Sequence, residues 1–310
     1  MSYVVSFENV YKIYPPNTIA LRGLSFSVKK NDWLVILGPN GAGKTTTLKI
    51  ISTITRPSKG KVKVFGHDVS KDRDVIRSKL CIVPQEICLD PWFPLEKSLE
   101  FIARMHGINK KEAKKLVKSA LKKVGLLGHE RKLVEALSTG MMRRAQLAIA
   151  FIVDRPLILL DEPTLGVDII GKFEIWELLR NELKNRTVLI ATNDLIEAEK
   201  LGQKVLLINN GESIAFGNVN DIVRQQVGEL TLRISLKSKD YIQSIIDKLK
   251  EEVSSEKLIY GKTKTISIVI NSVEEAMMLL SALSDYSNII ESFGLDRFSL
   301  EDLFRKLINR

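Results

Sequence analysis

The sequence predicts an α/β protein in which a largely parallel sheet is covered by helices and is followed by a small α+β domain. From residue 3 to about residue 225, short apolar runs with strand character alternate with helical patterns, as is typical of parallel sheets. One of these runs ends in a glycine-rich loop and another ends in two carboxylates, and open α/β sheets bind ligands at such strand ends. The expected strands include residues 33–37, 81–83, 157–160 and 188–191.

A different pattern begins near residue 228. Apolar residues first alternate with polar ones, which indicates a strand, and then recur at helical spacing. Ser272 and Glu275 have the spacing of a capping box, which predicts the start of a helix. The expected elements are strands over residues 230–236 and 266–270 and helices over residues 242–249, from Ser272 onward and from Ser299 onward. We therefore divide the chain into a first domain, residues 1–227, and a small α+β domain, residues 228–310, for which a ferredoxin-like arrangement is a candidate.

Composition limits the class of protein. The chain has 310 residues, of which 45% are hydrophobic and 27% are charged, which is ordinary for a globular protein with a sizeable core. No apolar run approaches the roughly 18 to 20 residues that cross a bilayer, and residues 1–10 show no signal-peptide pattern. We therefore expect a cytoplasmic protein that does not span a membrane by itself. Cys81 and Cys88 are too few for a zinc site and are expected to be reduced packing residues.

The chain is strongly basic, with a net charge of +10 and an isoelectric point near 9.4. Such a charge favours an anionic partner, which is either a nucleic acid or the inner leaflet of a membrane. Residues 110–124 predict an amphipathic helix whose polar side is rich in lysine. That side is either a solvated surface or a surface that approaches anionic lipid, and charge alone does not decide between them.

The most specific motif follows the first apolar strand of the predicted parallel sheet. The strand that ends at Leu37 runs directly into a glycine-rich loop, after which a helical pattern begins. This is a Walker A phosphate loop, in which glycines let backbone N–H groups turn toward phosphate at a helix N-terminus. Lys44 is expected to reach the β- and γ-phosphates of a nucleotide, and Thr45 to ligate Mg²⁺. The predicted nucleotide-binding residues of the loop are Gly38, Pro39, Asn40, Gly41, Ala42, Gly43, Lys44, Thr45 and Thr46.

Two carboxylates end another apolar strand. Asp161 and Glu162 follow residues 157–160, which indicates a buried parallel strand that delivers both side chains to the ligand-binding edge of the sheet. Asp161 is expected to hold Mg²⁺, and Glu162 to orient or deprotonate the attacking water. A solvated acidic turn is the alternative for an isolated pair of this kind.

A third motif resembles the signature of the ABC ATPase family. It comprises residues 137–144, Leu-Ser-Thr-Gly-Met-Met-Arg-Arg, and it precedes Asp161 by about the interval that the family requires. The resemblance implies that the hydroxyl of Ser138 and the N–H of Gly140 contact the γ-phosphate of ATP bound to the opposite subunit, assisted by the helix dipole. A plain helix start is the alternative for this segment alone.

The remaining landmarks fall in the order of that family, and the resemblance covers residues 1–225. It implies an ABC nucleotide-binding domain with a mostly parallel sheet, an antiparallel N-terminal part and a helical subdomain. Tyr14 lies where an aromatic ring stacks on adenine, although it could equally pack on the sheet. Gln85 matches the Q-loop glutamine, which senses Mg²⁺ and the γ-phosphate and couples to the membrane domain. Asp168 matches the D-loop, which links the two sites of a dimer.

Two features depart from the common family pattern. The signature has Thr139 and Met141 where the commonest version has Gly and Gln, and this variant is similar to the ABC-2 type exporters that include drug-resistance subunits. The switch loop has Asn193 where the family has histidine. Asparagine can still donate a hydrogen bond to the γ-phosphate, but it cannot carry a positive charge or relay a proton, so hydrolysis is expected to be slow.

The resemblance implies an ATPase subunit that uses ATP and Mg²⁺ to power a separate membrane permease, with export of a small or amphipathic molecule as its task. Two such subunits, identical or different, would bind ATP head to tail at the cytoplasmic face of the membrane. A soluble ABC protein that acts on ribosomes or nucleic acid is one alternative, supported only by the basic charge. A nucleotide-gated regulatory module with little hydrolysis, suggested by Asn193, is a second, and an importer is a third.

A proline-bounded loop after Gln85 carries two aromatic residues, Trp92 and Phe93. Exposed aromatic side chains on a loop indicate an interface, and the matching region of the family faces the membrane domain. Local packing of the two rings is the alternative.

Overall fold

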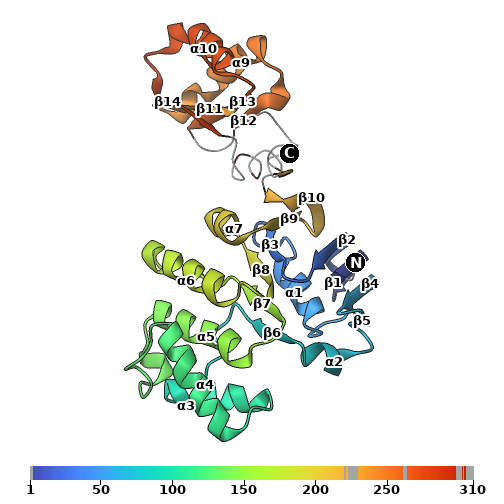
Figure 1. Ribbon diagram of the computed structural model, residues 1–310. Coiled ribbons are helices and arrows are strands. Elements are labelled where there is room, and N and C mark those ends of the chain that lie inside the picture. Colours follow the sequence, from blue (N-terminus) through green and yellow to red (C-terminus); the bar gives the residue numbers. More distant parts are fainter. Residues whose placement is uncertain are drawn as a thin grey trace. The chain divides into compact units, whose positions relative to one another are not determined.

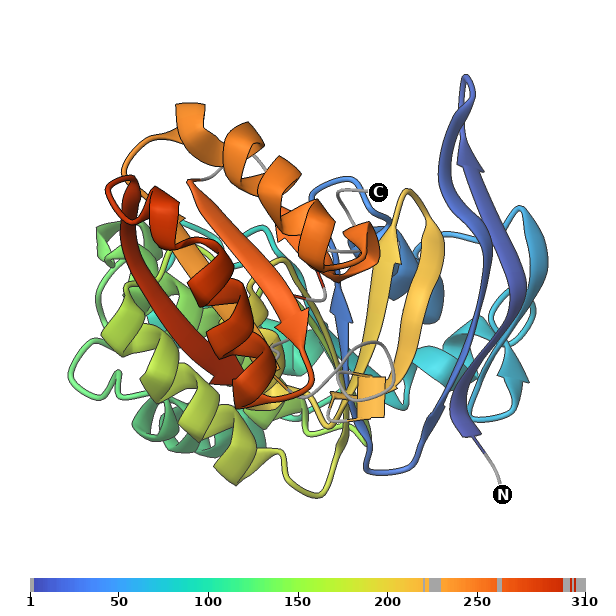
Figure 2. The same cartoon turned by 90° about the horizontal axis from the view of Figure 1, so that it is seen from above.

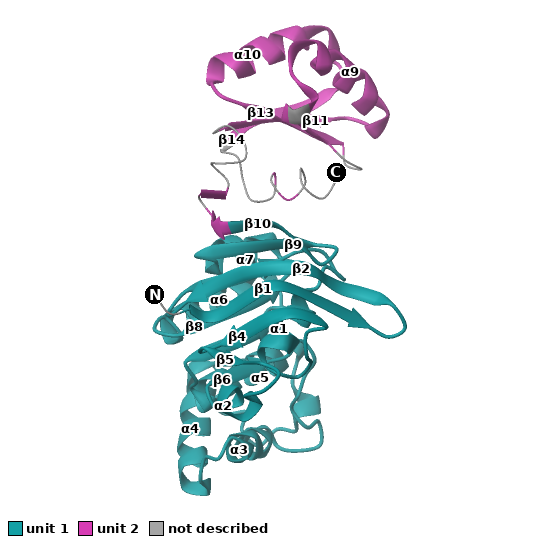
Figure 3. Cartoon of the chain, turned by 90° about the vertical axis from the view of Figure 1, so that its right-hand side faces the viewer, with its two compact units in different colours: residues 1–216 teal, residues 217–310 magenta. Residues whose placement is uncertain are grey.

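The computed structural model describes residues 3–219, 221–222, 230–260 and 264–297, together with residues 302 and 304. The chain divides into two compact units, Met1–Phe216 and Gly217–Arg310 (Figure 3). The sequence places this boundary later, after residue 227. The boundary falls within β10 (Glu212–Asn218), whereas the change in hydrophobic pattern that marks it in the sequence starts only at Leu230, where β11 (Leu230–Leu236) begins.

Within the described residues, the first unit is built on a six-stranded sheet of order β10-β9-β3-β8-β7-β6 (Figure 1). The pairs β9–β3, β3–β8, β8–β7 and β7–β6 are parallel, as predicted. β3, β7 and β8 are buried along their whole length, which is why their sequences are continuous apolar runs without alternation. The strands are β3 (Trp33–Leu37), β6 (Leu80–Val83), β7 (Leu157–Asp161), β8 (Thr187–Thr192), β9 (Lys204–Asn209) and β10 (Glu212–Asn218).

An antiparallel sheet of order β2-β1-β4-β5 forms the N-terminal part of this unit, as the family resemblance implies. Strands β1 and β2 form a long antiparallel pair (Figure 2). One core cluster joins Phe7 of β1, Leu48 of helix α1 and Ile36 of β3, so α1 is packed between the two sheets. The elements are β1 (Tyr3–Tyr14), β2 (Thr18–Lys29), α1 (Lys44–Ile51), β4 (Lys59–Val64), β5 (His67–Asp68) and α2 (Arg73–Arg77).

Helices α3, α4 and α5 pack on one another and form the helical subdomain. The side chain of Asn109 accepts the N–H of Glu112 and caps α4, whose predicted apolar stripe is buried at Val117 and Leu121, while its lysines stay exposed. The helices of this unit after α2 are α3 (Leu95–Met105), α4 (Lys110–Lys123), α5 (Thr139–Val153), α6 (Ile169–Glu182) and α7 (Leu195–Leu201). Throughout the described ranges, no helix is both long and apolar enough to cross a bilayer.

The two cysteines have different environments. Cys81 on β6 is buried, and burial raises the pKa of its thiol to about 12, which suits a packing residue. Cys88 is exposed in the loop after β6, so the prediction that it is a packing residue is wrong. Strand β6 ends at Val83, and Cys88 lies in the surface loop that follows it.

The described part of the second unit is an antiparallel sheet of order β12-β13-β11-β14, with helices after β11 and β13. This order and the β-α-β-β-α-β succession are those of a ferredoxin-like fold. Ser272 accepts the N–H of Glu275 and caps α10, as the capping box predicts. The helix expected from Ser299 onward lies outside the described residues, apart from residues 302 and 304. The elements are β11 (Leu230–Leu236), α9 (Ile242–Glu252), β12 (Leu258–Tyr260), β13 (Thr265–Ile270), α10 (Val273–Ala282) and β14 (Ile290–Arg297).

Candidate functional site

The loop between β3 and α1 has the close packing and the backbone conformations that only glycine permits. A Cβ on Gly38 would lie 2.2 Å from the carbonyl oxygen of Ile208, and one on Gly43 would lie 2.6 Å from that of Ala20. Gly43 also has a φ of 108° and no side chain caps the helix that follows, so the first N–H groups of α1 are left to bind an anion. Lys44 is buried, and its Nζ donates to the carbonyl oxygens of Gly38 at 2.9 Å and Pro39 at 3.2 Å. The ammonium group is therefore held at the loop.

Asp161 ends β7 and lies against α1. The hydroxyl of Thr45 donates to Oδ1 of Asp161 over 3.2 Å, and both residues present oxygen atoms of the kind that Mg²⁺ prefers. Burial raises the pKa of Asp161 and the charge of Glu162 adds to this effect, while the hydrogen bond from Thr45 acts against it. A hydroxyl and a carboxylate in contact at the phosphate loop are residues that fit Mg²⁺.

Glu162 follows Asp161 in a backbone conformation that is rare for a side chain of its size. Its φ is 47°, and its N–H donates to the carbonyl oxygen of Ala191 over 2.8 Å. Non-glycine residues in this region are strained, and such strain is concentrated at functional sites. Oε1 lies 3.5 Å from Nζ of Lys44, so the carboxylate points toward the phosphate loop rather than into solvent. The structure therefore excludes the alternative of a solvated acidic turn.

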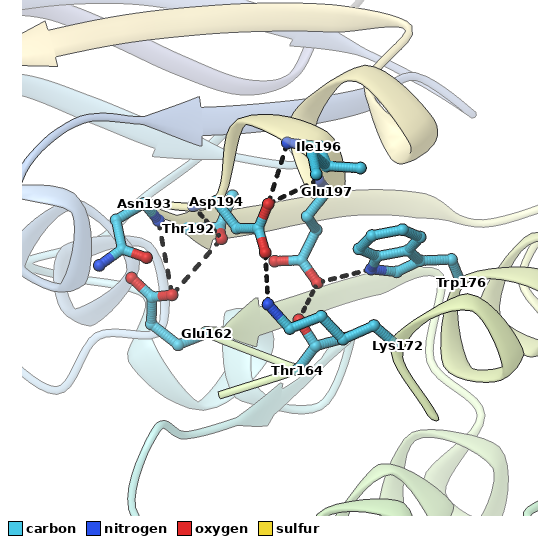
Figure 4. Close-up of polar contacts among 9 residues, drawn as sticks. All are labelled: Glu162, Thr164, Lys172, Trp176, Thr192, Asn193, Asp194, Ile196 and Glu197. Atoms are coloured by element: carbon cyan, nitrogen blue, oxygen red, sulfur yellow. Dashed lines mark hydrogen bonds and ion pairs between the residues drawn. The ribbon is translucent and has the colours of Figure 1, made fainter. Parts of the chain in front are cut away.

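The switch loop contacts Glu162 from the other side. The hydroxyl of Thr192 and the backbone N–H of Asn193 both donate to Oε2 of Glu162, each over 3.4 Å (Figure 4). The side-chain amide of Asn193 donates to Oδ1 of Asn40 over 3.2 Å. Asn193 therefore joins the carboxylate to the phosphate loop. Thr192 was not among the predicted site residues. Its position at the end of a buried strand, next to Asn193, could have identified it from the sequence.

A cavity of about 480 Å³ lies over the phosphate loop and brings together residues from distant parts of the chain. Tyr14 and Gln85 line it, as predicted, and the cation of Lys12 lies 4.7 Å from the centre of the Tyr14 ring. Its full lining is Tyr14, Thr18, Ile19, Ala20, Asn40, Gly41, Ala42, Gly43, Lys44, Thr45, Thr46, Gln85, Glu162, Leu165 and Asn193. Thr18, Ile19 and Ala20 were not predicted. A larger cavity of about 1340 Å³ beside β1 and β2 contains no predicted site residue.

The backbone around Gln85 is held by two buried side chains of α5. Arg143 donates to the carbonyl oxygen of Gln85 over 2.9 Å, and Gln146 donates to those of Pro84 over 2.8 Å and Glu86 over 2.6 Å. Neither Arg143 nor Gln146 was predicted. Both lie about sixty residues along the chain from the loop that they hold.

Ser138, Gly140 and Asp168 do not line the cavity. Ser138 is the N-cap of α5 and accepts the N–H of Met141 over 3.3 Å. Asp168 is the N-cap of α6 and accepts the N–H of Gly171 over 2.9 Å. Both are exposed, so their side chains are placed at helix starts and are not brought to the phosphate loop of their own chain.

Comparison with known proteins agrees with this geometry. Residues 21–165 match the family model described as ABC transporter. The linearmycin resistance ATP-binding protein LnrL of Bacillus subtilis is 35% identical over 231 residues, which make up 74% of each chain. The daunorubicin/doxorubicin resistance ATP-binding protein DrrA of Streptomyces peucetius is 29% identical over 98% of this chain and 92% of its own, so that match extends over both units.

A solved structure has the same fold as the first unit. It is a dimer of the ATP-binding cassette MJ0796 in a post-hydrolysis state with ADP and Pi bound, and it matches with a TM-score of 0.63 and 26% identity over 69% of this chain and 98% of that chain. The family follows from a phosphate loop after β3, a carboxylate pair at the end of β7 and a 35% identical relative. The chain belongs to the ATP-binding proteins of the ABC transporter family.

Proposed function

We propose that this chain hydrolyses ATP to power a separate membrane permease that exports a small or amphipathic molecule. The observation that carries the proposal is the position of Glu162, whose carboxylate lies between Lys44 of the phosphate loop and the switch residues Thr192 and Asn193. A carboxylate in that position can accept a proton from water that attacks a γ-phosphate. The relatives LnrL and DrrA are named for resistance to linearmycin and to daunorubicin and doxorubicin, which supports export as the task.

The predicted site residues then have the following roles in the reaction. The loop N–H groups and Lys44 bind the phosphates, Tyr14 contacts the base, and Asn193 donates to the γ-phosphate. Thr45, Asp161 and Gln85 are the residues that would hold Mg²⁺. When bound, the ion would neutralise charge on the phosphate oxygens. Glu162 orients the attacking water and accepts its proton.

The site is completed by a second ATPase subunit. Ser138, Gly140 and Asp168 lie outside the cavity of their own chain, which is expected if they act on the nucleotide of the opposite subunit. The start of α5 is suited to this because Ser138 is its cap and a Cβ built on Gly140 would meet no atom of another segment within 4 Å. The second subunit is either another copy of this chain or a related ATPase.

The contact to the permease is proposed to involve the loop before α3. Trp92 is 72% exposed and Phe93 is 51% exposed, so neither ring packs in the interior of the first unit. The carbonyl oxygen of Phe93 accepts the N–H of Val134 over 3.1 Å, and that of Pro91 accepts the N–H of Glu135 over 3.2 Å. Residues 134–135 lie just before the signature segment. Displacement of this loop by the permease would therefore also displace the start of α5.

The test is ATP hydrolysis in lipid vesicles that hold a candidate permease, which is to be sought among the membrane proteins encoded next to this chain. The permease is expected to raise the rate, and an exported amphipathic compound to raise it further. The basic charge is the one feature that supports the nucleic-acid alternative. The competing explanation of that charge is that the exposed lysines of α4 are solvated or approach anionic lipid. Stimulation by RNA, with no response to the permease, would establish the nucleic-acid alternative instead.

A further inference from the structure

Glu197 is a fully buried acid that the mechanism above does not use. It lies in the first turn of α7, four residues after Asn193, and its side chain has 0% exposure. Burial raises the pKa of its carboxyl group, while the hydroxyl of Thr192, the indole of Trp176 and the hydroxyl of Thr164 act in the opposite direction. Burying an acid lowers the stability of the fold, so its presence here calls for a structural or functional reason.

Capping of α7 is not that reason. Asp194 and Glu197 have the spacing of a capping box, in which the glutamate would reach back to the N–H of Asp194. That N–H instead donates to the hydroxyl of Thr192 over 3.0 Å. Asp194 itself accepts the N–H groups of Ile196 at 2.9 Å and Glu197 at 3.1 Å, so the helix start is already satisfied (Figure 4).

The side chain of Glu197 instead joins three segments of the site. Its Oε1 accepts the hydroxyl of Thr164 over 2.8 Å and the indole N–H of Trp176 over 3.0 Å (Figure 4). Thr164 is two residues beyond Glu162, and Trp176 belongs to α6, whose cap is the D-loop residue Asp168. One oxygen atom therefore connects the switch helix α7, the segment after the carboxylate and the helix that follows the D-loop.

A second contact runs parallel to the first. Lys172 of α6 pairs with Asp194 over 2.5 Å, and Lys172 and Trp176 are four residues apart and lie on the same side of α6. Helices α6 and α7 are thus joined at two successive positions. The first is an ion pair between partly exposed side chains, whereas the second is fully buried and includes the turn after Glu162.

This turn determines where Glu162 points. The N–H of Leu165 donates to the carbonyl oxygen of Glu162 over 3.1 Å, so residues 162–165 form a tight turn that contains Thr164. Glu162 itself is held at a φ of 47°, a conformation that persists only when its surroundings fix it. The switch loop contacts Oε2 of Glu162 through Thr192 and Asn193. A shift of α7 relative to Thr164 therefore changes both of these hydrogen bonds.

We propose that Glu197 is a positioning residue for ATP hydrolysis, which fixes the switch loop, the turn after Glu162 and helix α6 relative to one another. The role needs an acceptor at Oε1 and no charge, because both partners are donors and Oε2 has no hydrogen-bond partner in the part of the chain that the structure describes. The inference rests on the proposed function for its readout, which is the rate of ATP hydrolysis.

The experiment measures kcat and KM for ATP in five variants of the full chain, each assayed with the permease. Glu197→Ala is expected to lower kcat by about tenfold or more, with KM within about threefold of wild type, because positioning acts on the transition state rather than on nucleotide affinity. Glu197→Gln keeps the acceptor and is expected to recover kcat to within about threefold of wild type. Glu199→Ala, an exposed carboxylate on the same helix, is the matched control and is expected to match wild type.

Two further variants keep the test decisive if Glu197→Ala does not fold, which thermal unfolding will reveal. Thr164→Val removes one donor and keeps the shape of the side chain, and Trp176→Phe removes the other donor and keeps an aromatic ring, although a smaller one. Each is expected to lower kcat by roughly threefold to tenfold. Wild-type kcat in folded Glu197→Ala, or in both donor variants, would overturn the inference. A loss of kcat in Glu197→Gln equal to that in Glu197→Ala would also overturn it. A wild-type protein that does not hydrolyse ATP would instead contradict the proposed function.

Discussion

The backbone N–H of Asn193 lies 3.4 Å from Oε2 of Glu162 and donates a hydrogen bond to it. The amide side chain of the same residue donates to Asn40 of the phosphate loop over 3.2 Å. Asn193 is therefore the one residue in the described part of the site that contacts both the carboxylate through its backbone and the phosphate loop through its side chain. Its chemistry should affect the rate of phosphoryl transfer directly.

Asn193→His is expected to raise kcat at least several-fold with little change in KM for ATP. Histidine supplies a stronger donor and a charge beside the phosphoryl oxygens, where charge spreads in the transition state. The change corresponds to about 1 kcal/mol in the barrier. Steady-state ATPase assays with the permease present measure it. An equal or lower kcat would show that another group already serves this role or that a conformational step sets the rate.

Removal of Mg²⁺ is expected to stop hydrolysis, and Asp161→Asn is expected to weaken the response to the metal. The amide lacks the negative charge of the carboxylate that contacts Thr45, so the Mg²⁺ concentration for half-maximal rate should rise by about tenfold or more. Thr45→Ser keeps the hydroxyl and serves as the control. An unchanged magnesium titration in Asp161→Asn would remove this residue from the metal site.

Replacement of Trp92 and Phe93 by alanine together is expected to reduce association with the permease while ATP binding stays intact. Both rings are exposed, and exposed aromatic rings contribute strongly to interfaces. Ile54→Ala, which changes another exposed apolar side chain of the first unit, is the control. Co-purification with the permease measures the effect, and unchanged co-purification would place the contact elsewhere.

Glu197→Gln is expected to stabilise the first unit at neutral and alkaline pH. Burial raises the folded-state pKa of Glu197, so the folded state binds the proton more tightly than the unfolded state. The resulting stability is fully present below the unfolded pKa and is lost as the pH rises through the folded pKa. The variant should therefore raise the melting temperature by roughly 2 to 4 °C at about pH 8 and by less at about pH 5. Thermal unfolding of both proteins measures it, and a shift of equal size at both pH values would be evidence against the buried charge.

The site residues could be predicted from the sequence where they lie next to one another in the chain. The phosphate loop is continuous in the chain, and Asp161 and Glu162 directly follow an apolar strand, so their side chains fall at a known edge of the sheet. The parallel strands β3, β6, β7 and β8 were predicted within one residue at each end, because buried strands are continuous apolar runs, whereas the parallel strand β9 was not among the named strands. The antiparallel strands of the N-terminal sheet entered only through the family resemblance, since β1 contains several register shifts that disturb its alternation.

Contacts between distant segments could not be predicted in this way. Arg143 and Gln146 have the appearance of ordinary helix residues until the fold brings Pro84 and Gln85 against them. Glu197 has capping-box spacing in the sequence, and only the tertiary structure shows that its side chain turns inward to Thr164. Local spacing therefore predicts which groups react, while the residues that hold these groups in place depend on packing between elements far apart in the chain.

Glu162 is proposed to act on the attacking water at an ATP site shared by two subunits. The most direct test is Glu162→Gln, assayed for turnover, for nucleotide binding and for association of the ATPase subunits in the presence of Mg-ATP. The amide keeps the shape of the side chain but cannot accept the proton, so turnover should be abolished while ATP still binds and the dimer accumulates. Hydrolysis at the wild-type rate by Glu162→Gln would contradict the account, because the base would then be a different group.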